Sequence, residues 1–103
     1  FVEVTSGNAA KLLGMYPRKG AIAADSDADI TIIDPSFKKA LRMADLHVRD
    51  YSPWENWQVE GWPTTVMLRG KLMVNNGELL GSPSDGKLIS RKIDPAVVNK
   101  PAF

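Results

Sequence analysis

Apolar residues near the start of the chain recur with the spacing of a short helix. The positions that share one face are Ala9, Ala10, Leu12 and Leu13. They predict a helix over residues 7–13. Either Thr5 or Ser6 offers a hydroxyl that can accept a hydrogen bond from the first turn. Gly14 stands where a left-handed residue ends a helix, and Pro17 cannot continue it.

Two short apolar runs follow and predict strands. The first covers residues 20–23, and the second covers residues 29–34. The second run is continuously apolar rather than alternating, which is typical of a strand covered on both faces. Residues 25–27 lie between them as a turn, because short polar side chains bond to their own backbone. For residues 37–43 the pattern fits either a strand or a helical turn.

The second half of the chain alternates apolar and polar positions around tight turns. Residues 58–68 and 71–74 flank Arg69-Gly70, which predicts a hairpin with a two-residue loop. Asn76-Gly77 predicts a second hairpin turn, because both residue types accept positive φ. A short returning strand over residues 78–80 would complete it.

The remaining stretches read as loops and ends. Residues 44–57 hold several aromatic residues among turn formers, which predicts a long ordered loop pinned by its aromatics. Residues 81–86 form a loop, and residues 88–93 are either one more strand or a tail. Residues 94–103 read as a C-terminal arm or a frayed end. The fold class expected is mainly β, a short helix followed by a small β-sandwich or barrel-like sheet.

Length and composition narrow the possible functions. The chain has 103 residues, of which 44% are hydrophobic, which suits one small folded domain. The formal net charge is +1, so neither a nucleic acid nor an anionic membrane is an expected partner. There is no cysteine, which fits a reducing compartment, and we expect a cytoplasmic protein. Residues 1–4 have the pattern of the last part of a helix or strand, which predicts that the chain is a piece of a longer protein.

Few side chains suggest chemistry, and each has a simpler interpretation. His47 lies beside Asp45 and Asp50, but a metal site needs two or three converging ligands, so a local hydrogen bond is favoured. The alternating aspartates Asp25, Asp27 and Asp29 lack the glycine and the distal glutamate of a calcium loop. We therefore interpret them as a turn.

The tryptophans allow a second chemical hypothesis. Trp54, Trp57 and Trp62, with Arg69 and Lys71, would form a stacking platform for bases. The near-zero net charge favours core or interface roles instead. The residues alone predict no catalytic, cofactor-binding or metal-binding site in this chain.

An ordered series of short motifs resembles the C-terminal region of cyclic amidohydrolases, most closely the dihydropyrimidinase and hydantoinase group. Allantoinases and dihydroorotase-like proteins share much of this pattern. The series begins with the helix and corner motifs and ends beyond the hairpins, so that it covers nearly the whole chain. The motifs are Thr5-Ser6-x-Asn8-x-Ala10-Lys11, Gly14-Met15-Tyr16-Pro17-Arg18-Lys19-Gly20, Ser26-Asp27-Ala28-Asp29, Asp34-Pro35, Asp50-Tyr51-Ser52-Pro53-Trp54-Glu55, Gly61-Trp62-Pro63, Arg69-Gly70-Lys71, Asn76-Gly77 and Asp85-Gly86-Lys87.

The resemblance implies a fold and a place in it. The parent protein would join a (β/α)₈ barrel to a β-sandwich made from both chain ends. Residues 1–15 would be the last helical segment attached to the barrel, residues 16–93 the C-terminal part of the sandwich, and residues 94–103 an arm. The partners implied are the remainder of the same polypeptide and further copies in a homo-oligomer.

The resemblance also implies an activity for the parent. Two divalent metal ions, zinc being expected, would activate a bridging water that hydrolyses a cyclic amide C–N bond. The substrates would be cyclic ureides such as dihydropyrimidines or hydantoins. The metal ligands would lie upstream of Phe1, so no ligand is transferred to this chain.

Two positions depart from the family pattern. Asp25 and Asn56 stand where glycine is usual. If these positions require positive φ, Asp and Asn tolerate it better than most residues.

Two alternatives stay open. The second hypothesis is a free-standing β-module for protein association, with Tyr51, Trp54, Trp57 and Trp62 as its contact surface. A third hypothesis is an enzyme in its own right that uses His47 and the nearby acids. Whether the chain folds alone would distinguish the amidohydrolase segment from the free-standing module.

Overall fold

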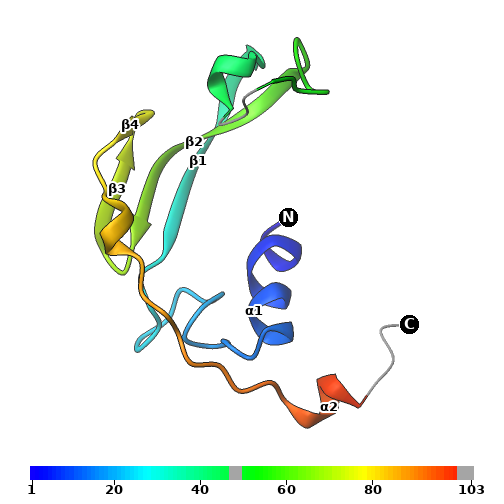
Figure 1. Ribbon diagram of the computed structural model, residues 1–103, viewed down its shortest axis with the longest axis vertical. Helices are drawn as coiled ribbons and strands as arrows, with labels where there is room; N and C mark the ends of the chain where they lie inside the picture. The colour runs from blue at the N-terminus through cyan, green and yellow to red at the C-terminus, as the bar shows by residue number, and fades with distance from the viewer. Residues whose placement is uncertain (47–49, 100–103) are drawn as a thin grey trace.

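A computed structural model describes residues 1–46 and 50–99 and shows a short helix followed by one antiparallel sheet (Figure 1). Its helical elements are η1 (Glu3–Gly7), α1 (Asn8–Leu12), η2 (Met43–Asp45), η3 (Pro83–Asp85) and α2 (Pro95–Val98). The strands are β1 (Ile30–Ala40), β2 (Gln58–Leu68), β3 (Lys71–Asn75) and β4 (Glu78–Leu79), in the spatial order β1-β2-β3-β4. The mainly β class is therefore confirmed.

The first helix begins earlier than predicted. The π-helical turn η1 runs directly into α1, and no side chain caps either element. The Thr5 hydroxyl donates a 2.8 Å hydrogen bond back to the Phe1 carbonyl oxygen. Such back-bonding is available to Thr inside a helix, so the predicted cap at Thr5 or Ser6 is wrong.

The end of the helix is as predicted. Gly14 has φ +68°. The Gly14 N–H donates to the Lys11 carbonyl at 3.1 Å, and the Met15 N–H donates to the Ala10 carbonyl at 2.8 Å. This pair of bonds is the Schellman arrangement, which satisfies the last carbonyl groups of the helix.

The predicted strand over residues 20–23 does not form. A strand needs an adjacent strand to satisfy its backbone groups, and none lies beside it in the part of the chain that the structure describes. Gly20 lies against α1 instead. A Cβ atom at Gly20 would approach Ala10 Cβ to 2.6 Å, so this close packing requires glycine.

Strand β1 confirms the predicted strand over residues 29–34 and extends it, so residues 37–40 are strand and Met43 begins a 3₁₀ turn. Its pairing with β2 shifts between Ile32 and Ile33 and again between Asp34 and Lys38. Pro63, which lacks an N–H, lies opposite Ile33 at the first shift, where the ladder can spare a donor. The expectation that both faces are covered is wrong for this chain, since Ile32 and Ile33 are 49% and 40% exposed.

Both predicted hairpins are confirmed. Arg69 and Gly70 have φ +48° and +79°, and Asn76 and Gly77 have +48° and +83°. These are the positive values that a two-residue type I′ loop requires. After β4 the chain passes through η3 and then runs as an extended tail, not as a strand, toward the C-terminal end of α1 (Figure 1, orange).

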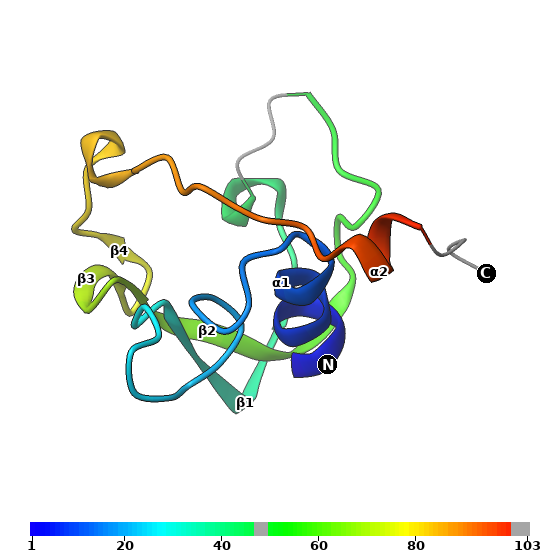
Figure 2. The same ribbon diagram turned by 90° about the horizontal axis from the view of Figure 1, so that it is seen from below.

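Little of this chain is buried. Among the described residues, only Ala10 and Leu41 are buried hydrophobic side chains. The chain exposes 8415 Å², whereas a compact monomer of 11.3 kDa exposes about 5,700 Å². Its radius of gyration is 16.5 Å, whereas a compact domain of this length has about 13 Å. Within the described residues the sheet is a single layer (Figure 2), and no second layer packs against its apolar side chains.

Candidate functional site

Lys19 lies between two carboxylates. Its Nζ atom is 2.9 Å from Asp27 Oδ2 and also pairs with Asp29. The Arg18 Nε–H donates a 3.0 Å hydrogen bond to Asp27 Oδ2. The Lys19 side chain is only 13% exposed, so this charge is largely removed from water and neutralised by its partners.

Backbone bonds extend this charge cluster into a junction of three segments. The Asp27 N–H donates to the Arg18 carbonyl at 2.8 Å. The Arg69 N–H, at the β2–β3 hairpin tip, donates to Asp29 Oδ1 at 2.8 Å. The Gly70 N–H donates to the Ala28 carbonyl at 2.9 Å. The cluster therefore fastens the Pro17–Gly20 corner and the β2–β3 hairpin to the start of β1.

The pKa shifts of this cluster keep its three side chains Lys19, Asp27 and Asp29 charged at neutral pH. The hydrogen bond from Lys19, then that from Arg18, holds the pKa of Asp27 below its usual value despite burial. Burial acts to raise the pKa of Asp29, but Lys19 and the Arg69 N–H outweigh it and the pKa falls. Burial acts to lower the pKa of Lys19, but hydrogen bonds to Asp29 and Asp27 raise it overall.

Groups that stay ionised in this way are poor proton-transfer catalysts. A general base or acid works best with a pKa near the operating pH, and a nucleophilic lysine needs a lowered pKa. The Asp27 and Asp29 carboxylates are already paired with the Lys19 ammonium group. The turn interpretation of the alternating aspartates is therefore favoured over a calcium loop. We interpret the cluster as a structural junction.

The acids around His47 are placed only in part. His47 lies outside the described residues. Asp45 Oδ1 is 2.6 Å from Lys39 Nζ, and Asp45 Oδ2 accepts a 2.9 Å hydrogen bond from the Arg42 N–H. The hydrogen bond from Lys39, followed by the Arg42 N–H, lowers the pKa of Asp45. Asp45 is therefore engaged by Lys39 at the end of β1 and by the Arg42 N–H at the start of its own turn.

Four aromatic residues of this region meet in two pairs. Trp54 and Trp57 meet edge to face, with ring centroids 5.4 Å apart. Trp62 lies 6.1 Å from Phe37, and Lys39 Nζ lies 4.3 Å above the Trp62 ring. Trp62 is half-buried, whereas Trp54 and Trp57 are mostly exposed. Of the four residues of the predicted contact surface, Tyr51, Trp54 and Trp57 are thus exposed, whereas Trp62 packs against Phe37.

The loop before β2 is held by polar contacts and not by buried aromatics. Asn56 adopts φ +64°, and its Oδ1 atom accepts a 2.5 Å hydrogen bond from Arg42 Nη1. The Met43 N–H donates to Glu55 Oε2 at 2.6 Å. In the described part of this loop, the Arg42, Glu55 and Asn56 side chains add polar contacts to the edge-to-face contact of Trp54 with Trp57.

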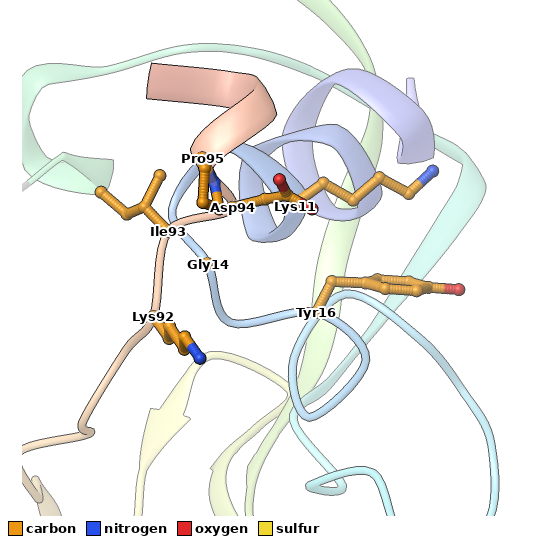
Figure 3. A pocket seen from close by; sticks show the side chains of 7 residues that line it. All are labelled: Lys11, Gly14, Tyr16, Lys92, Ile93, Asp94 and Pro95. Atoms are coloured by element: carbon orange, nitrogen blue, oxygen red, sulfur yellow. The ribbon is translucent and has the colours of Figure 1, made fainter. Parts of the chain in front are cut away.

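A groove of about 480 Å³ lies where the tail crosses the end of α1 (Figure 3). Lys11, Tyr16, Lys92 and Asp94 line it together with Gly14, Ile93 and Pro95. The Lys11 and Lys92 side chains extend in different directions, and Lys11 lies over the Tyr16 ring (Figure 3). The polar groups do not converge on one point, so the groove has no constellation for catalysis.

Within residues 1–46 and 50–99, no three His, Cys, Asp or Glu side chains gather as a metal-ion site. No helix in these ranges has the length and apolar character needed to cross a membrane.

Comparison with known proteins identifies the family. The sequence profile of the Amidohydrolase family matches residues 1–73. The D-hydantoinase of Ralstonia pickettii is 44% identical over 93 residues, which are 89% of this chain and 20% of that protein. The D-hydantoinase of Geobacillus stearothermophilus is 37% identical over 92 residues, 88% of this chain and 20% of that protein. The chain belongs to the amidohydrolase family.

Solved structures place the chain within the hydantoinase and dihydropyrimidinase group. A D-hydantoinase structure superposes with a TM-score of 0.85 at 43% identity, covering 89% of this chain and 20% of that one. The dihydropyrimidinase of Brevibacillus agri superposes with a TM-score of 0.84 at 40% identity, covering 87% of this chain and 20% of that one. The chain is homologous to a segment of these enzymes and spans about one fifth of their length.

Proposed function

We propose that this chain is a non-catalytic segment of a cyclic amidohydrolase of the hydantoinase/dihydropyrimidinase type. The observation that carries the proposal is the match of 89% of the chain to D-hydantoinase in both sequence and structure. The complete polypeptide would hydrolyse the amide C–N bond of a cyclic ureide. This segment would support the fold in which that reaction takes place.

The ion-paired carboxylates of the segment favour a structural role over a catalytic one. Asp27, Asp29 and Asp45 all lie within ion pairs with lysines of this same segment. Their lowered pKa values keep them ionised and paired at neutral pH. A carboxylate already engaged in this way has little capacity to accept a proton from a water nucleophile.

Metal chemistry belongs elsewhere in the proposed polypeptide. A hydantoinase-type reaction would use divalent metal ions, but the described residues of this chain do not form a matching ligand set. No step of the reaction is therefore assigned to them. We expect the helical residues 1–15 to contact the catalytic part, residues 16–93 to form the β-domain, and residues 94–103 to act as an arm.

A segment exchange tests this proposal. The matching fifth of the Ralstonia pickettii D-hydantoinase is replaced by this chain, and hydrolysis of hydantoin and dihydrouracil is measured. We expect kcat/KM within about tenfold of the parent enzyme, because no reacting group is exchanged. A chimera with the melting temperature of the parent but no hydrolysis would contradict the proposal.

Two substitutions in the chimera test the non-catalytic role separately. Lys19→Met and Asp45→Asn each remove a charged group that would be a candidate for chemistry. We expect lower thermal stability with kcat unchanged within about twofold. A loss of kcat of about a thousandfold with normal stability would instead assign that residue to catalysis.

The alternative is a free-standing module for protein association. The exposed Trp54–Trp57 pair favours it, since aromatic residues are enriched at interfaces. The two proposals differ in whether the chain alone is a folded, closed unit.

A further inference from the structure

The turn between β3 and β4 presents an asparagine directly before a glycine. Asn76 and Gly77 are both exposed, with φ +48° and +83°. The space around Gly77 is open, since nothing lies within 4 Å of the position that its Cβ atom would take. The chain then enters β4, which consists of Glu78 and Leu79. The turn therefore lies at the last strand of the sheet, where water reaches both of its central residues.

The groups of this turn that can react with each other are the Asn76 side-chain amide and the Gly77 N–H. Among residues 1–46 and 50–99, no protein group forms a hydrogen bond with either of them. The Asn76 N–H, in contrast, donates a 2.7 Å hydrogen bond to the Thr64 carbonyl oxygen. The main chain is thus anchored just before the reacting pair, whereas the pair itself stays accessible.

This pair has the chemistry for loss of the side-chain nitrogen as ammonia. After its proton is removed, the Gly77 nitrogen attacks Asn76 Cγ, so that an N–Cγ bond forms and the Cγ–Nδ2 bond breaks. The Nδ2 nitrogen leaves as ammonia and takes up the proton that Gly77 lost. Water then opens the five-membered imide at either of its carbonyl groups. Opening at Cγ gives aspartate, and opening at the main-chain carbonyl gives isoaspartate, whose backbone runs through Cβ.

We propose that Asn76 is a spontaneous deamidation site, and that its conversion to isoaspartate releases the strand β4. Glycine in the next position favours the reaction, because no Cβ atom hinders the approach of its nitrogen. Ring closure requires the turn to open locally, and β4 is joined to β3 through only the pairs Val74–Leu79 and Asn75–Glu78. A short, exposed pairing of this kind opens at low cost in free energy.

Two other asparagines are hindered in the same reaction. Asn56 precedes the bulky Trp57, and its Oδ1 atom accepts a hydrogen bond from Arg42. Asn75 precedes a residue with a side chain, and its own backbone belongs to the paired strand β3. The structure therefore singles out Asn76.

Asp85 also precedes a glycine but is protected by its charge. Its carboxylate accepts hydrogen bonds from Lys71 Nζ at 2.7 and 2.8 Å. These bonds, followed by one from the Ser82 N–H, lower the pKa of Asp85. An ionised carboxylate resists attack by a nitrogen nucleophile, so the same ring closure at Asp85 is disfavoured at neutral pH.

Isoaspartate at position 76 changes the length and the charge of the turn. The extra backbone carbon alters the loop that sets the β3–β4 register. The new carboxylate also repels Glu78, two residues away. The contacts at risk are the hydrogen bonds from the Leu80 and Gly81 N–H groups to the Met73 carbonyl oxygen, at 2.8 and 3.0 Å.

Peptide mass spectrometry tests the site directly. The full-length polypeptide is incubated in mildly alkaline native buffer and, in parallel, in denaturant. Trypsin releases residues 72–87 as one peptide, which carries Asn76 together with Asn75 and Asp85 as internal references. Digestion in H₂¹⁸O marks any conversion that occurs during the digestion itself, and fragmentation of the peptide assigns each product to its residue.

We expect native conversion at Asn76 to be at least about tenfold faster than at Asn75 or Asp85, because only its turn combines a following glycine with easy opening. Asn76→Gln is the matched control, since its amide would have to close a six-membered ring, and no product is expected there. A smaller ratio would overturn the proposal. Conversion in denaturant alone would also overturn it, because the folded turn would then prevent ring closure.

Hydrogen exchange tests the release of β4. The isoaspartyl fraction is compared with Asn76→Asp, which adds the same charge without the extra backbone carbon. We expect faster exchange of the Leu80 and Gly81 amides in the isoaspartyl protein and little change in Asn76→Asp. Equal exchange in the isoaspartyl and unmodified proteins would refute the release. Neither measurement depends on hydrolytic activity, so both stand apart from the proposed function.

Discussion

Gly14 and Lys92 are in direct backbone contact. The Lys92 N–H donates a 3.2 Å hydrogen bond to the Gly14 carbonyl oxygen. A Cβ atom on Gly14 would overlap the carbonyl group of Lys92. The glycine that ends the helix therefore also provides the space in which the C-terminal tail crosses it.

Gly14→Ala is expected to destabilise the full-length polypeptide by two additive effects. Alanine at φ +68° costs about 1 kcal/mol. The new methyl group also displaces the tail at Lys92. Gly77→Ala is the matched control, because Gly77 has φ +83° but nothing within 4 Å of its Cβ position. A thermal melt that shows equal losses for both variants would exclude the backbone contact.

Lys19→Met is expected to reduce the sensitivity of the fold to acid. Asp27 and Asp29 have pKa values below the ordinary 3.8, so their ion pairs stabilise fully above that pH. This stabilisation is lost as the pH falls through the lowered folded-state pKa values. Removing the Lys19 ammonium group lowers the free energy of unfolding at pH 7. It also makes the decrease of that free energy between pH 7 and pH 3 smaller.

Lys38→Met is the control for this pH experiment. Lys38 pairs with Glu60 at 2.7 Å, but both side chains are about two-thirds exposed. An exposed pair of this kind contributes little to stability. The melting temperature is measured against pH for both variants. Parallel curves for Lys19→Met and the unmodified protein would show that the cluster does not contribute.

Trp62→Ala is expected to cost more stability than Lys71→Ala. Trp62 packs against Phe37 and lies under the Lys39 ammonium group. Truncating it should cost about 3 kcal/mol, the lower end for tryptophan, because the ring is half-buried. The Lys71 side chain is 55% exposed, so its ion pair with the less exposed Asp85 is worth about 1 kcal/mol at most. Chemical denaturation of both variants measures the difference, and equal midpoints would show that Trp62 is dispensable for packing.

Asp25 is expected to accept glycine and to reject valine. Its φ is +67°, a conformation that Asp tolerates and that a β-branched residue does not. Asp25→Gly should change the unfolding free energy by less than about 0.5 kcal/mol, whereas Asp25→Val should cost about 1–2 kcal/mol. The two variants are compared by thermal melting, and equal stability would mean that the turn relaxes to negative φ.

The local features were predictable from sequence where one residue type determines the backbone. The hairpin turns at Gly70 and Gly77 follow from pairs of residues that accept positive φ. The positive φ at Asp25 and Asn56 follows from their standing where the family usually has glycine. For the hairpins the information lies within two neighbouring residues, and for Asp25 and Asn56 it lies in the family pattern at one position.

The predictions that were wrong concern features that depend on contacts with residues distant in sequence. Residues 20–23 have a strand-like sequence, but a strand forms only beside another strand. Ile32 and Ile33 have the sequence of a covered strand, yet they are exposed in this chain. The contact of Asp29 with the Arg69 N–H joins residues 40 apart, and no local pattern signals it.

The folding of the isolated 103-residue chain tests the central claim most directly. The claim is that this chain is a segment whose apolar surfaces are completed by the rest of an amidohydrolase polypeptide. A ¹H–¹⁵N correlation spectrum of the isolated chain at low concentration, together with its sedimentation, is the measurement. We predict narrow amide dispersion or self-association, because only Ala10 and Leu41 are buried among the described residues. A well-dispersed spectrum from a monomer would contradict the claim and favour a free-standing module.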